Sequence, residues 1–331
     1  MSKDRIIGID LGTSTSEVAV FENGEAVVIK NKEGEVIIPS VVGISQDNEL
    51  IVGKDARDQF ILRPDNTVME VKRLMGSGKT VTMGEKEYKP EEISSYILSY
   101  LKECAEAHLG ESVERAVITV PAYFTDEQRR ATVEAGKLAG FKVERIINEP
   151  TAAALTYGID HMDENEHVLV YDLGGGTLDV TLLEMFDGVL EVKASSGNNH
   201  LGGKDFDDKL INYLIDKFEE EHNIDLSKDV KAMVRLKEAA EACKVKLSTS
   251  EEEKIVLPFI ANKDNEPIAM EILITRDIFE GLIKDLIDST KAQIDLVLKD
   301  GSLSAGDITT ILLVGGSTRI PLVKNFLEQI F

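Results

Sequence analysis

Short apolar runs alternate with longer amphipathic segments along almost the whole chain. The short runs are rich in Val and Ile and are bounded by Gly, Pro or Asn, which predicts strands. We expect two hairpins, at 5–21 and 170–183, and further strands at 26–30, 36–38, 40–45, 116–120, 142–147, 189–195, 255–259, 269–274 and 309–314. The longer segments repeat apolar residues every three or four positions and predict helices at about 54–62, 90–109, 125–139, 203–221, 227–247 and 276–298.

Local start and stop signals agree with this spacing. Pro90 begins a predicted helix and Gly110 follows its end. Thr125 and Gln128 form a capping box at the start of another. Pro64 is expected to end the helix before it. Strands and helices therefore alternate, as in an α/β protein.

The chain has 331 residues, which is long for one domain and comfortable for two. We place the boundary in the acidic loop at 161–166. The predicted lobes are 1–160, with an inserted subdomain at about 41–110, and 161–331, with a helix-rich inserted subdomain at about 203–285.

A glycine-rich turn between two strands, residues 170–180, carries the clearest chemical signal. Its three glycines let the backbone approach a ligand and present N–H groups to it, as in phosphate-binding loops. Asp172 and Asp179 flank the glycines, and Thr177 adds a hydroxyl. Carboxylates beside a phosphate suit a hard cation such as Mg²⁺ between them. A glycine-rich hairpin with two solvated aspartates is the alternative that this stretch alone leaves open.

Residues 5–21 repeat this pattern. Asp10 matches Asp172 and Gly12 matches Gly174, at a constant offset of 162 positions (172 − 10 = 162). A repeat at half the chain length suggests two lobes of one ancestral unit. Two such hairpins facing each other would clamp a nucleotide from both sides, which favours phosphate binding over a solvated hairpin.

Three further stretches have features of ligand sites. Glu149 follows the strand at 142–147, at the sheet edge where α/β proteins bind ligands, but a carboxylate at a helix start explains it equally well. The glycine pair 315–316 follows a buried strand and could accept a flat ligand against its backbone. Residues 76–80 resemble the end of a P-loop, but Arg73 stands where that motif requires glycine, so we reject it.

Composition narrows the class of protein. The chain has 37 Lys and Arg against 60 Asp and Glu, a net charge of −23, which argues against nucleic acid or an anionic membrane as main partner. Cys104 and Cys243 are too far apart in sequence to indicate a metal site or a disulfide framework. No signal-peptide pattern and no run of about 18 apolar residues occurs, which predicts a cytoplasmic protein.

An ordered set of motifs identifies a family. They are Gly8-Ile-Asp10-Leu-Gly-Thr13, Lys72-Arg-Leu, Val120-Pro121-Ala-Tyr-Phe, Ile146-Ile-Asn-Glu149-Pro-Thr-Ala-Ala-Ala, Asp172-Leu-Gly-Gly-Gly-Thr177, His200-Leu-Gly-Gly203 and Val314-Gly-Gly-Ser-Thr-Arg-Ile-Pro321. This set resembles the nucleotide-binding (ATPase) domain of the heat-shock protein 70 family, in its DnaK-type molecular chaperones, over essentially the whole chain. Each motif is moderately specific by itself, whereas the ordered set is highly specific.

The resemblance implies the actin-like ATPase (ribonuclease H-like) α/β fold, with two lobes of two subdomains each around a nucleotide cleft. It implies slow, Mg²⁺-dependent ATP hydrolysis, with ATP or ADP, Mg²⁺ and K⁺ as ligands. Lys72 would hold the γ-phosphate and the attacking water, and Asp10 and Asp172 would orient Mg²⁺ through water. Glu149, Thr177 and Asp179 would complete the polar site. The implied phosphate ligands are Gly12, Thr13, Ser14, Gly174, Gly175, Gly176 and Thr177. The rest of the nucleotide site would be Gly202, Gly203, Glu241, Lys244, Ser248, Gly315, Gly316, Ser317 and Arg319.

The resemblance also implies partners, namely a J-domain co-chaperone and a nucleotide exchange factor, for a monomeric chain with no nucleic-acid or membrane partner. Pro121 and Arg129 match residues that relay nucleotide state, and Arg145 and Asn148 match a surface that meets J-domain proteins. Unfolded peptide would bind only through a domain that this chain lacks. Because Phe331 lies inside an amphipathic pattern, we expect the second lobe to be incomplete.

Some positions depart from the family pattern. Ser14 replaces Thr and Thr15 stands where Asn is usual, Lys204 replaces an acidic residue beside the ribose, and Val245 varies the adenosine face. Backbone donors perform most phosphate binding, so we expect adenine affinity to be affected more than phosphate binding. The alternatives are a sugar or acid kinase of the same fold, which would need an acceptor pocket, and an actin-like filament protein.

Overall fold

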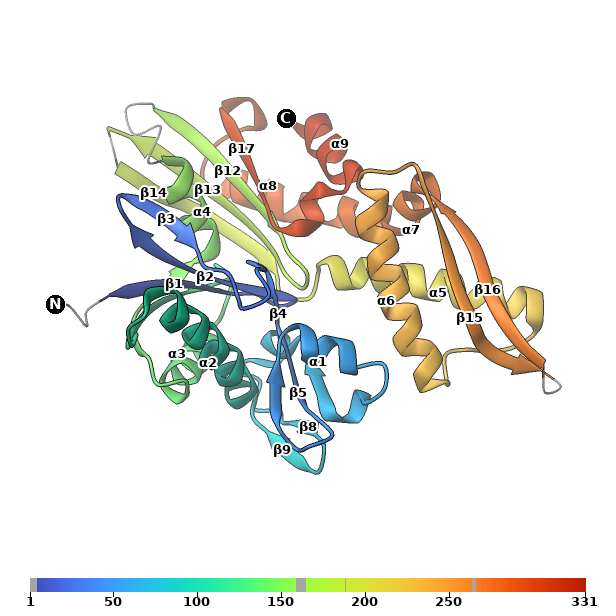
Figure 1. Ribbon diagram of the computed structural model, residues 1–331. Coiled ribbons are helices and arrows are strands. Elements are labelled where there is room, and N and C mark those ends of the chain that lie inside the picture. The colour runs from blue at the N-terminus through green and yellow to red at the C-terminus, as the bar shows by residue number, and fades with distance from the viewer. Residues whose placement is uncertain (1–4, 159–164, 188, 264–265) are drawn as a thin grey trace.

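The computed structural model describes residues 5–158, 165–187, 189–263 and 266–331. Two sheets lie at its centre (Figure 1), one in each half of the chain. The first has the order β11-β10-β1-β2-β3 with β4 beside β2, and the second has the order β14-β13-β12-β17. Their strands are β1 (Ile6–Leu11), β2 (Thr15–Glu22), β3 (Glu25–Val28), β4 (Ile38–Pro39), β10 (Arg115–Val120), β11 (Lys142–Asn148), β12 (Glu166–Leu173), β13 (Leu178–Phe186), β14 (Val189–Asn198) and β17 (Thr310–Val314).

The two sheets share one topology. In each, an antiparallel hairpin (β1–β2 or β12–β13) is extended by a third antiparallel strand (β3 or β14). On its other side the first hairpin strand pairs in parallel with a strand from later in the chain (β10 or β17). The predicted repeat is therefore confirmed at the level of strand pairing.

Helices cover these sheets and join them. They are α2 (Pro90–Leu109), α3 (Asp126–Leu138), α4 (Glu149–Gly158), α7 (Arg276–Ser289), α8 (Lys291–Asp300) and α9 (Pro321–Ile330). Helix α2 packs on β1 and β2, and α8 packs on β13 and β14. Helix α4 contacts strands of both sheets, and its Ala154 is buried against Val168 and Leu183. We call the elements from β1 to α4 lobe I and those from β12 to α9 lobe II.

Two smaller groups of elements project from the sheets and face each other across the molecule (Figure 1). The group from lobe I contains β5 (Val41–Ile44), β6 (Leu50–Val52), α1 (Lys54–Gln59), η1 (Pro64–Asn66), β7 (Thr67–Met69), η2 (Val71–Leu74), β8 (Val81–Met83) and β9 (Lys86–Tyr88). The group from lobe II contains α5 (Gly203–His222), α6 (Val230–Leu247), β15 (Glu252–Lys263) and β16 (Glu266–Thr275), and the remaining short helices are η3 (Ala305–Asp307) and η4 (Gly316–Arg319). The predicted lobe boundary at 161–166 lies mostly outside the described residues.

Most predicted elements are confirmed within a few residues. Helix α2 begins at Pro90 and is followed by Gly110 at φ 68°, and Thr125 caps α3 by accepting from the Gln128 N–H. Cys104 and Cys243 are free, and burial raises the pKa of the Cys243 thiol to about 12. Within the described part of the chain, no helix combines the length and apolarity needed to cross a bilayer.

The prediction of one helix at 276–298 is wrong in one respect, because this segment forms two helices, α7 and α8, which meet at Thr290. The Thr290 side chain is fully buried. Its hydroxyl donates to the Ile287 carbonyl at 2.7 Å and accepts from the Tyr171 hydroxyl at 3.0 Å. The Thr290 N–H also bonds the Ile287 carbonyl, three residues back rather than four. This local bonding competes with the regular helical pattern, and apolar spacing alone does not reveal it.

Replacing Thr290 with Val should lower the free energy of unfolding by about 1–3 kcal/mol, because it leaves the buried Tyr171 hydroxyl without its acceptor. Urea unfolding of Thr290→Val, Tyr171→Phe and the double variant measures this. The double variant should be less destabilised than the sum of the two single variants. Strict additivity would show that the two hydroxyls do not interact.

Candidate functional site

The two hairpins carry their matching residues in the same register. In lobe I Asp10 pairs with Glu17, and in lobe II Asp172 pairs with Asp179. Adding 162 to each residue of the first pair gives the second pair, and the same holds for the next pair along each hairpin, Leu11–Ser16 and Leu173–Leu178. Because the two registers are equal, corresponding residues of the two turns occupy equivalent positions, and both turns direct their backbone toward the space between the lobes.

The turns of the two hairpins touch. A Cβ added to Gly175 would lie 2.1 Å from the Ser14 Oγ, and one added to Gly176 would lie 2.7 Å from the Thr13 methyl carbon. A side chain at either glycine would therefore require Ser14 or Thr13 to move. The prediction that the two hairpins face each other is confirmed by these contacts.

Beside the turns, one buried lysine is surrounded by carboxylates. Lys72 comes from η2 and is only 6% exposed, and its Nζ donates to the Glu149 Oε1 at 2.7 Å. Glu149 is the first residue of α4, directly after β11. Asp10, at the end of β1, accepts from the Thr119 hydroxyl at 2.9 Å, and Asp172 is 8% exposed. Residues from four separate elements thus converge on one point.

The electrostatics of this cluster show an excess of negative charge. Burial, together with the charges of Asp10 and Asp172, raises the pKa of Glu149 even though Lys72 acts against the shift. Burial also raises the pKa of Asp172, and it raises that of Asp179 to about 6. For Lys72 burial favours the neutral amine, but the surrounding carboxylates outweigh it and raise the pKa. Burial is thus the main cause of the raised carboxylate pKa values, and the charges of several carboxylates around one lysine are the cause of its raised pKa.

Hard oxygen ligands with surplus negative charge fit a divalent cation such as Mg²⁺. The described residues contain no group of three or more His, Cys, Asp or Glu side chains arranged to hold a metal directly. A cation held by fewer than three such side chains takes its remaining ligands from water or from phosphate oxygens.

A second layer of glycines lies behind the lobe II turn. A Cβ on Gly202 would lie 2.4 Å from the Gly176 nitrogen, and one on Gly315, at φ 85°, would lie 2.3 Å from the Leu173 carbonyl oxygen. The Ser317 hydroxyl donates to the Gly174 carbonyl at 2.9 Å. These contacts attach η4 and the start of α5 to the glycine-rich turn of lobe II (residues 174–177). The backbones of these three segments therefore form one surface.

The side of the site formed by α5 and α6 carries paired charges. Lys244 donates to the Asp207 carboxylate at 2.7 Å and to the Gly203 carbonyl at 3.1 Å. Burial raises the pKa of Asp207 to about 7, although Lys244 acts in the opposite direction. Glu241 accepts from Arg57 of α1 at 2.7 Å, so this ion pair connects the two projecting groups.

Most of these residues line one open cleft of about 2040 Å³ between the lobes. Its walls include most of the site residues predicted from the sequence, namely Asp10, Gly12, Thr13, Ser14, Lys72, Glu149, Asp172, Gly174, Gly175, Thr177, Gly203, Glu241, Lys244, Ser248, Gly315, Gly316, Ser317 and Arg319. Gly176, Asp179 and Gly202 do not line it. Gly176 and Gly202 pack directly behind the wall, and the Asp179 carboxylate accepts from the Tyr123 N–H at 3.1 Å.

Residues predicted to relay or receive signals lie away from the wall of the cleft. The Arg129 guanidinium donates to the carbonyls of Ala122, Phe124 and Pro121, at 2.9, 3.1 and 3.4 Å, and so holds the loop between β10 and α3. Arg145 is an exposed residue of β11, and Asn148 is its last residue.

Sequence reasoning did not assign several charged residues that line the cleft. Arg57, Glu70 and Asp207 belong to this group, together with Asp208, Lys237 and Glu238. These residues stand at ordinary positions of helices and turns, where the sequence does not indicate a ligand site. They line the cleft only because of how the two lobes pack against each other.

A family model described as Hsp70 protein matches residues 6–82 and 77–331. The chain belongs to the Hsp70 family. The family resemblance and the actin-like ATPase fold expected from the motifs are therefore confirmed.

Curated relatives extend over nearly all of the chain. It is 50% identical to Chaperone protein DnaK of Thermotoga neapolitana over 331 residues, which is 99% of this chain and 56% of that protein. The protein of the same name from Thermotoga maritima gives the same values. That from Thermosipho melanesiensis is 49% identical over 330 residues, 99% of this chain and 55% of that protein. The chain spans about half the length of the curated relatives it matches.

Replacing Gly202 with Ala should disrupt this Hsp70-family cleft, because the added methyl group meets backbone atoms that cannot rotate away. We expect ATP affinity to fall about tenfold or more. Isothermal titration with ATP measures the change. Gly281→Ala is the matched control, since nothing lies within 4 Å of its added Cβ. Wild-type affinity in Gly202→Ala would contradict this account of the glycine layer.

Proposed function

We propose that this chain is the nucleotide-binding part of a DnaK-type chaperone and that it binds ATP with Mg²⁺ and hydrolyses it slowly. The observation that carries the proposal is the buried Lys72–Glu149 pair, 2.7 Å apart, beside two facing glycine turns of equal register. Membership of the Hsp70 family supports it. In the complete protein, the nucleotide state would control a peptide-binding domain.

The proposed roles follow from the chemistry of the side chains. Phosphoryl transfer to water needs charge neutralisation and alignment more than covalent help. Lys72 supplies a fixed positive charge for the γ-phosphate and the attacking water. Asp10 and Asp172 would hold Mg²⁺ through water, and the bound ion would neutralise phosphate charge. The backbone N–H groups of both turns donate to phosphate oxygens. Glu149 orients Lys72, and with Asp179 it is the proposed neighbour of K⁺.

The adenosine would lie between α5, α6 and η4. Its proposed contacts are Glu241, Lys244, Ser248, Gly315, Ser317 and Arg319, and Gly202, Gly203 and Gly316 are proposed to complete the nucleotide site. The exposed Val245 lies in the same wall of the cleft. A J-domain co-chaperone and a nucleotide exchange factor are the proposed partners, the first at the surface that includes Arg145 and Asn148. A monomeric state and a cytoplasmic location remain predictions, as do the lobe limits at 160 and 161.

Replacing Lys72 with Ala should reduce ATP hydrolysis about 100-fold or more and leave ATP bound, because it removes the charge at the γ-phosphate but keeps the backbone donors. Single-turnover hydrolysis and equilibrium binding measure the two quantities separately. Lys254→Ala is the control, since Lys254 pairs with Glu271 on the exposed face of β15 and β16. Wild-type hydrolysis that requires an added sugar would favour the kinase alternative, and ATP-dependent sedimentation would favour the filament alternative.

Removing Mg²⁺ with EDTA should weaken ATP binding and stop hydrolysis by the wild-type chain. Asp172→Asn should bind metal-free ATP as the wild type does but gain little affinity when Mg²⁺ is restored, because one carboxylate of the proposed cation site is lost. Binding titrations with and without Mg²⁺ measure this. An equal response to Mg²⁺ in both proteins would remove Asp172 from the cation site.

A further inference from the structure

The short helix that carries Lys72 begins in an unusual backbone conformation. Glu70 precedes η2 and has φ 55° and ψ 26°, the left-handed region that residues other than glycine rarely occupy. Such a conformation persists where surrounding contacts hold it in place. Only Val71 separates Glu70 from Lys72, so a change in the backbone at Glu70 would move the lysine.

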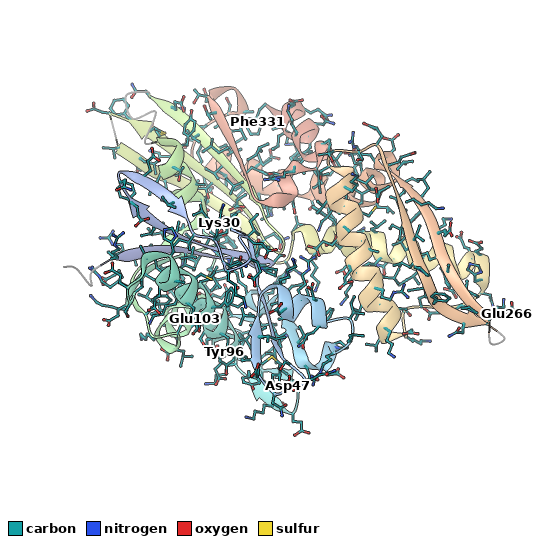
Figure 2. The ribbon with its side chains drawn as sticks, in the orientation of Figure 1. Lys30, Asp47, Tyr96, Glu103, Glu266 and Phe331 are labelled. Atoms are coloured by element: carbon teal, nitrogen blue, oxygen red, sulfur yellow. The ribbon has the colours of Figure 1, made fainter. Side chains whose placement is uncertain are left out.

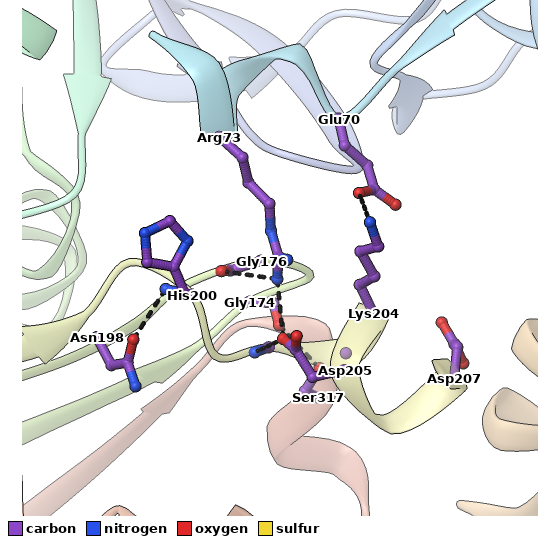
Figure 3. Close-up of polar contacts among 12 residues, drawn as sticks. Glu70, Arg73, Gly174, Gly176, Asn198, His200, Lys204, Asp205, Asp207 and Ser317 are labelled. Carbon is purple, nitrogen blue, oxygen red and sulfur yellow. Dashed lines mark hydrogen bonds and ion pairs between the residues drawn. The ribbon is translucent and has the colours of Figure 1, made fainter. Parts of the chain in front are cut away.

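Contacts from lobe II hold both ends of this helix (Figure 3). The Lys204 Nζ, on the first turn of α5, lies 2.8 Å from the Glu70 Oε2. On the other side of Lys72, Arg73 donates to the Asp205 carboxylate at 2.8 Å and to the Gly176 carbonyl at 3.0 Å. The segment that carries the proposed catalytic lysine is thus attached at both ends to the opposite lobe.

The two attachments differ in how they are built. Arg73 is largely buried and contacts a glycine of the glycine-rich turn of lobe II, and Asp205 is also held by the Gly202 N–H at 2.7 Å. The Glu70–Lys204 pair is more open, with side chains 28% and 35% exposed, and both residues line the cleft. A partly exposed pair stabilises little by itself but is easily broken and re-formed. It therefore suits a contact that opens when the lobes separate.

This pair depends on the charge at position 204. An acidic side chain at this position would repel Glu70 instead of binding it. Asp208 lies one turn further along the same helix, and the charge of Lys204 opposes the burial that raises the pKa of Asp208. The lysine at 204 therefore makes this contact between the lobes attractive.

We propose that the Glu70–Lys204 ion pair is a positioning contact that holds η2, and with it Lys72, in place when the lobes are closed. Neither residue touches the reacting atoms. The pair couples closure of the cleft to the position of the lysine, so hydrolysis proceeds at full rate only in the closed state. This inference rests on the proposed function, because it assigns the pair to that same ATPase site.

The test is a charge swap. Lys204→Glu and Glu70→Lys should each lower the single-turnover rate of ATP hydrolysis about tenfold, because each replaces an attraction by a repulsion across the cleft. The double variant Glu70→Lys with Lys204→Glu should recover to within about threefold of the wild type. A role of Lys204 within its own lobe would give no such recovery. Lys209→Glu is the matched control, since Lys209 lies on the same helix and pairs with Asp285 of lobe II, and it should hydrolyse ATP as the wild type does.

A second measurement separates this inference from the proposed function. Amide hydrogen exchange of residues 70–76 in nucleotide-free protein should rise in both single variants and return to the wild-type level in the double variant. Unchanged exchange in Lys204→Glu, or a double variant no better than the single ones, would overturn the positioning role. If the wild type does not hydrolyse ATP, the proposed function fails, and hydrogen exchange alone still decides whether the pair holds η2.

Discussion

One buried lysine among carboxylates is the constraint on which the site depends. Lys72 is 6% exposed, and the charges of Glu149, Asp10 and Asp172 raise its pKa although burial acts in the opposite direction, so that three carboxylates surround one lysine. Each member is delivered by a different element: η2, the start of α4, the end of β1 and the end of β12. The rest of the fold can be understood as the scaffold that brings these four ends together, and the surplus charge explains why the cluster suits a cation and phosphate chemistry.

The interior of each lobe is well packed, whereas the contacts that join the two lobes across the cleft are weak. Large apolar clusters fill each of them, with Ile7, Ile9 and Leu101 in lobe I and Tyr171, Phe206 and Phe279 in lobe II. Figure 2 draws the described side chains along the ribbon. By contrast, partly exposed ion pairs such as Arg57–Glu241 and Glu70–Lys204 connect the projecting groups. Because such pairs contribute little next to buried apolar surface, movement between the lobes costs less than movement within them. A cleft that opens and closes around a nucleotide needs lobes that move relative to each other at a lower free-energy cost than they deform internally.

Much of the fold and most of the cleft wall could be predicted from the sequence, for local reasons. Helix α2 follows from Pro90, apolar spacing and Gly110, and the paired hairpins follow from the repeated Asp–Leu–Gly motif. The break at Thr290 was missed because its cause, a hydroxyl bonded to Tyr171, lies 119 positions away in sequence. Arg57 and Glu70 were missed because a charged residue on a short helix or turn usually marks a solvated surface.

The two matching hairpins, the glycines that keep their turns narrow and the family motifs can be identified from the sequence, because turn chemistry and apolar period are properties of neighbouring residues. Which charges meet depends instead on the three-dimensional packing. Lys72 and Glu149 are 77 positions apart within lobe I, so their pairing follows from how that lobe folds. Glu70 and Lys204 belong to different lobes, so their pairing follows from how the lobes pack together. Short-range patterns carry no information on that docking, which depends on α4 and the shape of both cores.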